Sequence, residues 1–150
     1  MRVVIQRVRY ARLSVGGELI SQISQGLMVL VGIAEEDSRE EINYLCKKLA
    51  SLRVFDDDEG VMNRSVMDVG GEVMLVSQFT LMANTKKGNR PSYTHAARPE
   101  ISRPLYEEFC SALEKVLDKE VARGRFGADM QIELVNDGPV TITIDTARDR

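Results

Sequence analysis

The chain contains the unbroken apolar run Leu27-Met28-Val29-Leu30-Val31-Gly32-Ile33, and shortly after it the polar stretch Ser38-Arg39-Glu40-Glu41. A continuous apolar run of this length is typical of a β-strand that is covered on both faces. The polar stretch has the spacing of a capping box, which predicts the start of a helix. Apolar residues then recur at helical spacing, at Ile42, Leu45, Cys46 and Leu49. This succession of buried strand and amphipathic helix predicts a mixed α/β fold.

The segments on either side of this stretch predict further strands. Residues 2–8 and 13–20 carry β-branched residues at alternating positions, with Gly16-Gly17 as a turn between strand candidates. Leu52–Phe55 predicts a short strand, and the acidic segment 56–60 after it predicts a turn. That segment lacks the alternating oxygen ligands and terminal Glu of a calcium loop, which favours a turn over a calcium site.

The second half of the chain predicts one more helix and three more strands. The predicted strands are 72–82, 130–135 and 140–146, and residues 83–103 are expected to form a loop. The helix is expected to start at Pro104, which suits a first turn, and to end at Gly124. The order of elements predicts a single α+β domain over residues 1–150, with a curved, barrel-like β core and two packing helices.

The composition suits one soluble domain. The 150 residues are 43% hydrophobic and 29% charged, and every apolar run is shorter than the ~20 residues of a membrane span. The N-terminus has no signal-peptide pattern, which predicts a cytoplasmic protein. Cys46 and Cys110 lie in helical patterns and are expected to be free, buried thiols. With no Cys-x-x-Cys and a single histidine, we expect no metal site and no cofactor.

Charge limits the contact with nucleic acid. The net charge is −3, whereas proteins that wrap a long duplex are normally basic. Contact with a nucleic acid is therefore expected to be local. The cations closest together in a segment poor in acids are Lys86, Lys87, Arg90, Arg98 and Arg103. A solvated surface loop explains the same pattern without any partner.

The segment Ser77-Gln78-Phe79-Thr80-Leu81 places polar side chains in an otherwise apolar predicted strand. Strand alternation predicts Ser77 and Phe79 on one face and Gln78 and Thr80 on the other. A buried polar group without a partner costs about 1–3 kcal/mol, so these side chains either satisfy backbone groups at the strand end or form a site. A nucleophilic Ser77 or Thr80 would need a base. The only histidine is His95, and no spacing rule links it to either, which disfavours a serine triad.

Two further segments allow both a structural and a functional interpretation. Asn136-Asp137-Gly138-Pro139-Val140-Thr141 contains an Asp-Gly hairpin signal, but a rigid glycine–proline backbone can also reject a substrate sterically. Phe126 and Met130 are core candidates, or they form an apolar slot for a stacked base.

These motifs together resemble the D-aminoacyl-tRNA deacylases, which hydrolyse wrongly charged tRNA, and the resemblance extends over nearly the whole chain. The matching stretches are Met1–Val8, Leu52–Phe55, Asp68–Leu81, Lys87–Ser92, Gly124–Met130 and Val135–Thr141. The resemblance implies a β-rich homodimer in which Gly138-Pro139 matches a cis-proline motif that enters the partner's pocket. It implies an enzyme that acts on the 3′ end of aminoacyl-tRNA, needs no obligatory metal, and also accepts achiral glycine.

The resemblance also implies roles for single residues. Backbone N–H groups of Gln78 and Phe79 would stabilise the oxyanion, and Ser77 would shape the pocket. Thr80 would act as nucleophile or contact the terminal ribose, and we favour the contact, assisted by the substrate's 2′-hydroxyl. The remaining assignments are Gly138 and Pro139 for rejection of L-residues, Arg7 as a brace, Ala97, Phe126 and Met130 for the terminal adenine, and Lys86, Lys87 and Arg90 for the tRNA backbone.

The chain departs from the family pattern at two places. Met82-Ala83-Asn84 stands where the family often has Tyr-Ala-Asp, and Tyr93 stands where Phe is common. Two other functions fit the sequence: an esterase or amidase that uses Thr80 or Ser77 on a small substrate, and a module that binds nucleic-acid ends without chemistry. The uncharged motifs argue against the second function.

Overall fold

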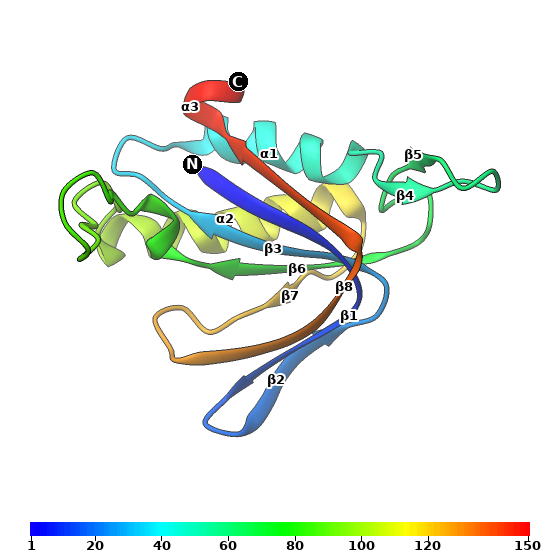
Figure 1. Ribbon diagram of the computed structural model, residues 1–150, viewed down its shortest axis with the longest axis horizontal. Helices are drawn as coiled ribbons and strands as arrows, with labels where there is room; N and C mark the ends of the chain where they lie inside the picture. Colours follow the sequence, from blue (N-terminus) through cyan, green and yellow to red (C-terminus); the bar gives the residue numbers. More distant parts are fainter.

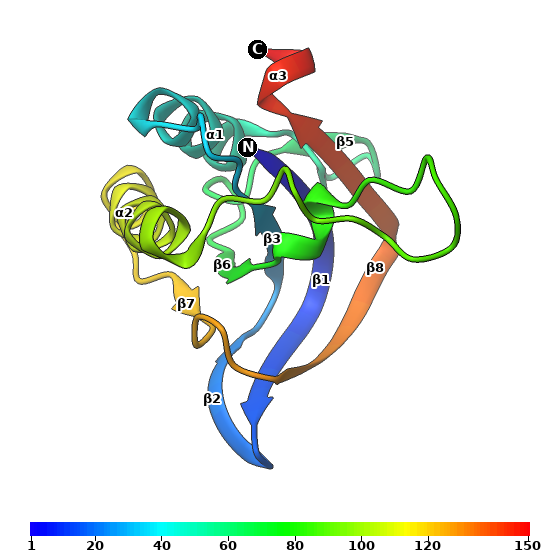
Figure 2. The same cartoon turned by 90° about the vertical axis from the view of Figure 1, so that its left-hand side faces the viewer.

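The chain folds into a strongly bent β-sheet with two long helices on one side of it (Figures 1 and 2). A computed structural model describes all residues 1–150. In chain order the elements are β1 (Arg2–Val15), β2 (Glu18–Ile23), β3 (Gly26–Gly32), α1 (Arg39–Ser51), β4 (Phe55–Asp56), β5 (Met62–Arg64), β6 (Glu72–Ser77), the 3₁₀ helix η1 (Phe79–Met82), α2 (Pro99–Leu117), β7 (Ala122–Arg123), β8 (Met130–Asp145) and α3 (Thr146–Asp149). None of the helices has the length and apolar character needed to cross a membrane.

The long strand β1 organises the sheet. One edge of β1 pairs antiparallel with β8, and the other edge pairs with β3 over its first half and with β2 over its second half. The sheet continues from β3 to β6 and β7, which are parallel neighbours. Because β2 curls back beside β7, where the Ser21 hydroxyl donates to the carbonyl of Arg123 at 2.8 Å, the sheet is nearly closed and barrel-like (Figure 2).

Side-chain alternation along the central strands builds two cores. On β3, Leu27, Val29 and Val31 face the helices, whereas Met28 packs inside the curved sheet. The same division holds on β6, where Val73 and Leu75 face the helices and Met74 and Val76 face the inside. Both faces of these strands are therefore covered, which confirms the prediction made from the apolar run at 27–33.

The two long helices differ in how well the sequence predicted their ends. Ser38 caps α1, with the predicted reciprocal hydrogen bonds to Glu41. Helix α2 begins at Pro99 rather than Pro104, because Pro99 also fits a first turn. Pro104 lies inside the helix, where it has no N–H to donate to the carbonyl of Glu100. The helix ends at Leu117 rather than at Gly124, because Asp118 takes the left-handed conformation (φ 52°) that normally favours glycine.

Four strand predictions also need correction. The predicted strand Leu52–Phe55 is reduced to β4, which begins at Phe55 and ends at Asp56. Residues 2–15 form one strand, and the Gly16-Gly17 turn leads into β2. The predicted strand 72–82 stops at Ser77, since the chain turns there into η1. The two predicted last strands are one bent strand, β8. Its bend lies where Val8 pairs with Asn136 and Gln6 with Thr141, so residues 137–140 bulge out of the β1–β8 ladder.

Candidate functional site

A cavity of about 660 Å³ lies where β3 and β6 end, between η1, the start of α2 and the segment before β8. Its lining is mostly apolar, and Asp129 is its only charged residue. The predicted site residues that line it are Ser77, Gln78, Phe79, Ala97, Phe126 and Met130. The structure therefore brings together six residues that the sequence takes from three separate segments.

The segment 77–80 leaves the sheet at the cavity. The N–H of Gln78 donates to the carbonyl of Val31 at 2.7 Å, which is the last bond between β6 and β3. Residue 79 then opens η1, whose first internal hydrogen bond joins the N–H of Leu81 to the carbonyl of Gln78 at 3.2 Å. The predicted alternation of faces is wrong here, because the strand ends and Ser77, Gln78 and Phe79 all line the same cavity.

The hydrogen bond of Gln78 also corrects its expected role. Its N–H already has a partner in Val31, so it is not a free oxyanion donor. Phe79 precedes the first internal hydrogen bond of η1, a position where N–H groups lack helical partners. The Gln78 side chain instead donates through Nε2 to the Thr80 hydroxyl oxygen at 2.6 Å. Thr80 is exposed and lies beside the cavity lining rather than in it.

Apolar side chains form two parts of the cavity wall. The exposed ring of Phe79 packs edge-on against Tyr93, with 5.1 Å between the ring centroids. Ala97 is buried and fixed by its N–H, which donates to the carbonyl of Ile33 at 2.8 Å. Across the cavity, Phe126 carries the Arg103 guanidinium over its ring at 5.7 Å. A flat apolar group has room to lie between these walls.

Gly138, Pro139 and Arg7 lie outside this cavity. The Gly138–Pro139 peptide bond is cis, and both residues are exposed. Arg7 is 8% exposed and donates through Nε to the carbonyl of Asp137 at 2.9 Å and through Nη1 to that of Val54 at 2.7 Å. In Figure 1 the bend of β8 lies on the right of the molecule, whereas η1 lies on the left. The bend that carries the glycine–proline turn thus lies on the opposite side of the molecule from η1.

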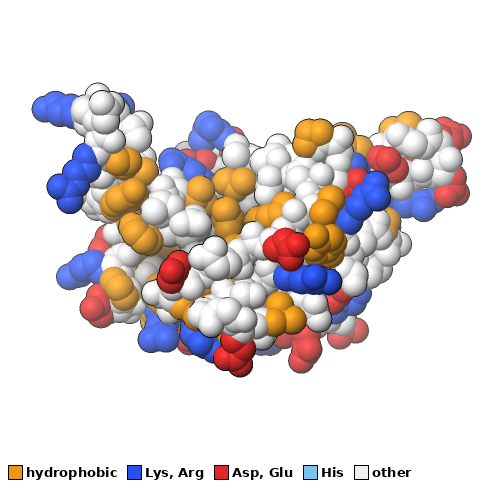
Figure 3. All heavy atoms as spheres, turned by 60° about the horizontal axis from the view of Figure 1, so that its bottom comes forward, with side chains coloured by type: hydrophobic (Ala, Val, Ile, Leu, Met, Phe, Trp, Pro, Cys, Tyr) orange, Lys and Arg blue, Asp and Glu red, His pale blue; other side chains and the backbone are white.

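The predicted basic patch divides into two parts. Arg98 pairs with Glu35 at 3.1 Å, and Arg103 with Glu107 at 3.8 Å. The other members, Lys86, Lys87 and Arg90, are exposed on the loop between η1 and α2. Figure 3 shows Lys and Arg side chains on the segment that projects at the left, where Figure 1 places this loop. Of the five predicted cations, these three have no acidic partner.

Asp129 is the only charged side chain in the cavity lining, and no histidine lies there to activate a hydroxyl. His95 is exposed and is not part of the lining. Cys46 and Cys110 are free and buried, as predicted, and burial raises the pKa of Cys46 to about 12 and that of Cys110 to about 11. No three His, Cys, Asp or Glu side chains come together in a way that could hold a metal ion. The groups in the lining that remain for chemistry are the Asp129 carboxylate, hydroxyls, amides and backbone N–H groups.

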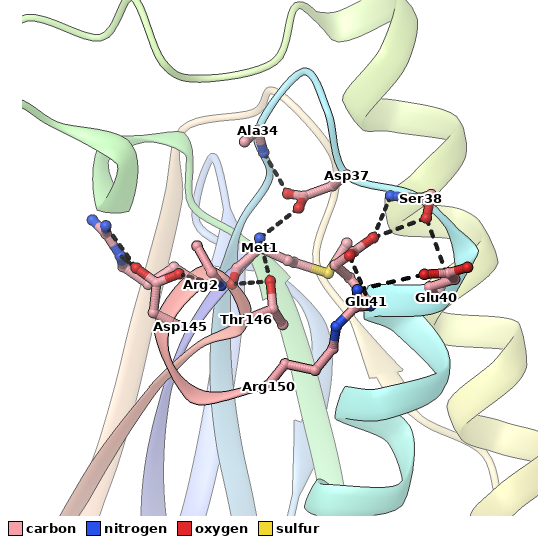
Figure 4. A network of polar contacts seen from close by, with 11 residues as sticks. Met1, Arg2, Ala34, Asp37, Ser38, Glu40, Glu41, Asp145, Thr146 and Arg150 are labelled. Carbon is pink, nitrogen blue, oxygen red and sulfur yellow. Dashed lines mark hydrogen bonds and ion pairs between the residues drawn. The ribbon is translucent and has the colours of Figure 1, made fainter.

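Sequence reasoning missed the support that the chain ends give to the cavity (Figure 4). Arg2 donates through Nη1 to the carbonyl of Leu81 in η1 at 2.6 Å, and its Nε and Nη2 bind the Asp145 carboxylate at 3.0 and 2.9 Å. Partial burial disfavours a charged Asp145, but hydrogen bonds from Arg2 and from the N–H of Ala147 lower its pKa overall. The partners lie at opposite ends of the chain, so no local pattern could have revealed them.

The loop before α1 is fixed from the same corner of the molecule (Figure 4). The α-ammonium of Met1 binds Asp37 at 2.6 Å and Thr146 at 2.9 Å, and the N–H of Ala34 donates to Asp37 at 2.7 Å. Ala34 in turn forms a bridge to Ala96 in the cavity wall. The first two residues of the chain therefore support η1 and the loop before α1, which both border the cavity.

Comparison with known proteins gives consistent matches over the length of the chain. Residues 4–145 match a protein family described as D-Tyr-tRNA(Tyr) deacylase. Two proteins described as D-aminoacyl-tRNA deacylase, from Bacteroides thetaiotaomicron and Bacteroides fragilis, are 58% and 61% identical over 146 residues, which is 97% of each chain. A third, from Porphyromonas gingivalis, is 60% identical over the same share of both chains.

Two solved structures share the fold. A protein described as "c-Myc DNA Unwinding Element Binding Protein" is 42% identical, with a TM-score of 0.91 over 97% of this chain and 99% of that one. A probable eukaryotic D-amino acid tRNA deacylase is 16% identical, with a TM-score of 0.83 over 95% of this chain and 97% of that one, and shows the fold alone. The mixed α/β architecture with its bent sheet is therefore shared by distant sequences.

Proposed function

The chain belongs to the D-Tyr-tRNA(Tyr) deacylase family and is a hydrolase that acts on D-aminoacyl-tRNA; from this premise we propose how its residues bind the substrate and reject L-residues. The observation that carries the proposal is a largely apolar cavity without a histidine in its lining, together with an exposed glycine–proline turn that lies outside the cavity of its own chain. Neither a triad esterase nor a module without chemistry fits this family.

The largely apolar cavity suits an ester that is already activated. An aminoacyl ester on a tRNA 3′ end needs a positioned water and a donor for the developing oxyanion more than it needs a strong nucleophile. We assign the donor to the N–H of Phe79, because it precedes the first internal hydrogen bond of η1. Ser77 shapes the base of the cavity next to it.

Thr80 contacts the terminal ribose in this proposal. The Gln78 amide donates to its hydroxyl oxygen at 2.6 Å, so the Thr80 proton points elsewhere and is available to a ribose oxygen. A nucleophilic role would require a group that accepts this proton, and the neighbouring amide is a donor. The 2′-hydroxyl of the substrate would then assist the attacking water.

The backbone wall that rejects L-residues, which we call the chiral wall, comes from a second copy of the chain. Gly138 and Pro139 bulge out of the β1–β8 ladder, and Arg7 holds the carbonyl of Asp137 beside them. On the other side, the Asn136 side chain accepts from the N–H of Val140 at 2.9 Å. An exposed turn braced on both sides is suited to enter a neighbouring cavity. Its main-chain carbonyls would clash with an L side chain, whereas a D-residue presents only hydrogen there, and glycine is accepted.

The tRNA end would extend across both cavity walls. Its terminal adenine fits between Ala97 and the apolar side chains of Phe126 and Met130, since unpaired bases are commonly held on aromatic and apolar surfaces. The loop with Lys86, Lys87 and Arg90 lies where phosphates of the same strand would pass, which keeps the nucleic-acid contact local in a chain of net charge −3. We place this activity in the cytoplasm, where aminoacyl-tRNA is found.

Side-by-side deacylation of D-Tyr-tRNA, L-Tyr-tRNA and Gly-tRNA by the purified protein, with chelator present, tests these proposals. We expect release of D-tyrosine and glycine but not of L-tyrosine. Release of L-tyrosine at a comparable rate would remove the chiral wall, and failure to release glycine would refute rejection by side-chain clash alone. Activity that appears only when metal is restored would contradict the proposed metal-free mechanism.

A further inference from the structure

The buried tyrosine on α2 makes a contact that none of the assignments above uses. Tyr106 is 3% exposed, and its hydroxyl donates to the carbonyl of Leu75 at 2.6 Å. The same oxygen accepts the N–H of Gly124 at 3.2 Å. One hydroxyl thus joins β6 to the segment that follows β7.

The position of this hydroxyl in the sheet is specific. The parallel pairing of β6 with β7 ends with Leu75 opposite Arg123. Continued pairing would bring the N–H of Gly124 to the β6 backbone, but no direct hydrogen bond joins Gly124 to Leu75. The Tyr106 hydroxyl lies between these groups and bridges them. The hydroxyl oxygen therefore sits between the carbonyl of Leu75 and the N–H of Gly124 and keeps the two segments apart, near the cavity.

The bridged segments lead to opposite sides of the cavity. Two residues after Leu75 comes Ser77, and two residues after Gly124 comes Phe126, and both line the cavity. The Tyr106 ring also packs beneath Phe126, with 6.1 Å between the ring centroids. Tyr106 itself is not part of the lining, so it acts on the cavity through these two segments.

There is little room for a side chain at Gly124, the glycine at the bridge. A Cβ built on Gly124 would lie 2.7 Å from Sδ of Met130, another residue of the cavity wall, and 3.4 Å from Val76. Gly124 therefore lies next to the Met130 side chain, and a shift of its segment relative to β6 would change the space at this part of the cavity wall. Burial raises the pKa of Tyr106 above its usual value, so the hydroxyl keeps its proton and remains a donor to Leu75.

We propose that Tyr106 is a positioning residue that sets the width of the apolar slot between the end of β6 and Phe126, and so determines how tightly the terminal adenine is held. The proposal rests on the assignment of this slot to adenine. It differs from a purely structural role, because a loss of stability alone would affect every substrate equally. A change in slot width affects only ligands that carry the base.

The test uses Tyr106→Phe with Tyr44→Phe as a matched control. Tyr44 on α1 also donates its hydroxyl to a main-chain carbonyl, that of Asp149 at 2.9 Å, but lies away from the cavity. The probes are two non-hydrolysable ligands, a D-tyrosyl amide of 3′-amino-3′-deoxyadenosine and the same amide on a ribose without a base. Deacylation kinetics with D-Tyr-tRNA are measured in parallel, well below the unfolding temperature of each variant.

We expect Tyr106→Phe to weaken binding of the adenosine ligand and to raise KM by about tenfold, because it removes both hydrogen bonds that hold the end of β6 and the Gly124 segment at their separation. Binding of the ligand without a base and kcat should each change by less than about twofold, and Tyr44→Phe should change none of these. Two outcomes would overturn the role of Tyr106. In the first, Tyr106→Phe weakens the binding of both ligands equally. In the second, it weakens the binding of neither, although the wild-type protein prefers the adenosine ligand. A wild-type protein without that preference would instead overturn the adenine assignment, and the proposal with it.

A second variant keeps the test independent of how well Tyr106→Phe folds. Gly124→Ala leaves the hydroxyl in place but brings a methyl group against Sδ of Met130, a flexible contact that the fold can tolerate. It should reproduce the selective loss of the adenosine ligand. Gly124→Ala with unchanged affinity for that ligand would contradict the proposal even if Tyr106→Phe were unfolded.

Discussion

Replacing Gly138 by alanine is expected to abolish deacylation while the protein stays folded. Gly138 has φ +139°, a conformation that costs an alanine about 1–3 kcal/mol. Its new Cβ would also lie 2.8 Å from Cγ2 and 2.9 Å from N of Val140, and overpacking of this kind adds about 1–3 kcal/mol. The free energy of unfolding should therefore fall by about 2–6 kcal/mol, which lowers Tm by about 4–24 °C in a domain of this size.

The effect on activity should be larger than the effect on stability at 25 °C. Relief of the contact with Val140 would move the Gly138 and Pro139 carbonyls, and a displacement near 1 Å in a catalytic site commonly costs about 100-fold in rate. Gly60→Ala is the matched control, because Gly60 also has a positive φ (+77°) but its Cβ would meet nothing within 4 Å. The assay combines thermal unfolding with release of D-tyrosine from labelled tRNA. A Gly138→Ala protein with near-normal rates on D-Tyr-tRNA would refute the role given to this turn.

Three further predictions address other parts of the molecule. Thr80→Val should lower kcat/KM by about tenfold or more through loss of the ribose contact, and quenched reactions should contain no acyl-enzyme; an ester trapped on Thr80 would defeat that assignment. Asp145 has a lowered pKa in the folded state, so its stabilising contribution is present above its unfolded pKa of about 3.9 and is lost as the pH falls through its folded pKa. The Tm difference between wild type and Asp145→Asn should accordingly shrink between pH 6 and pH 3, and a constant difference would argue against the pair with Arg2. Burial raises the pKa of Cys46 to about 12 and that of Cys110 to about 11, so neither thiol should react with a disulfide reagent at pH 8 until the protein unfolds, and fast labelling of the native protein would contradict their burial.

Local patterns predicted the elements of the fold better than their ends. The apolar run at 27–33 and the capping box at Ser38 are readable because burial on both faces and helix capping act on neighbouring residues. The start of α2 was misplaced because Pro99 and Pro104 both satisfy the same local rule. The end of α2 was misplaced because Asp118 adopts the left-handed conformation (φ 52°) that glycine normally adopts at the end of a helix.

The sequence predicted which residues form the site, but not how they are arranged and hydrogen-bonded. Three separate segments supplied six of the cavity residues, because polar residues in apolar strands and glycine-flanked aromatics have few purely structural uses. The occupied N–H of Gln78 was not predictable, since it depends on where β6 parts from β3. The supports from Arg2 and Tyr106 join positions 79 and 31 residues apart in the chain, and such contacts exist only once the sheet has formed.

The central claim is that each cavity is completed by the glycine–proline turn of a second copy. It is tested most directly with mixed dimers of Gly138→Ala and a cavity variant such as Phe126→Ala, purified with two different tags. Neither variant alone should be active, but each mixed dimer contains one intact cavity that faces one intact turn, so it should recover about half of the wild-type rate. Mixed dimers as inactive as both parents would contradict the account, because they would show that the turn and the cavity must belong to the same chain.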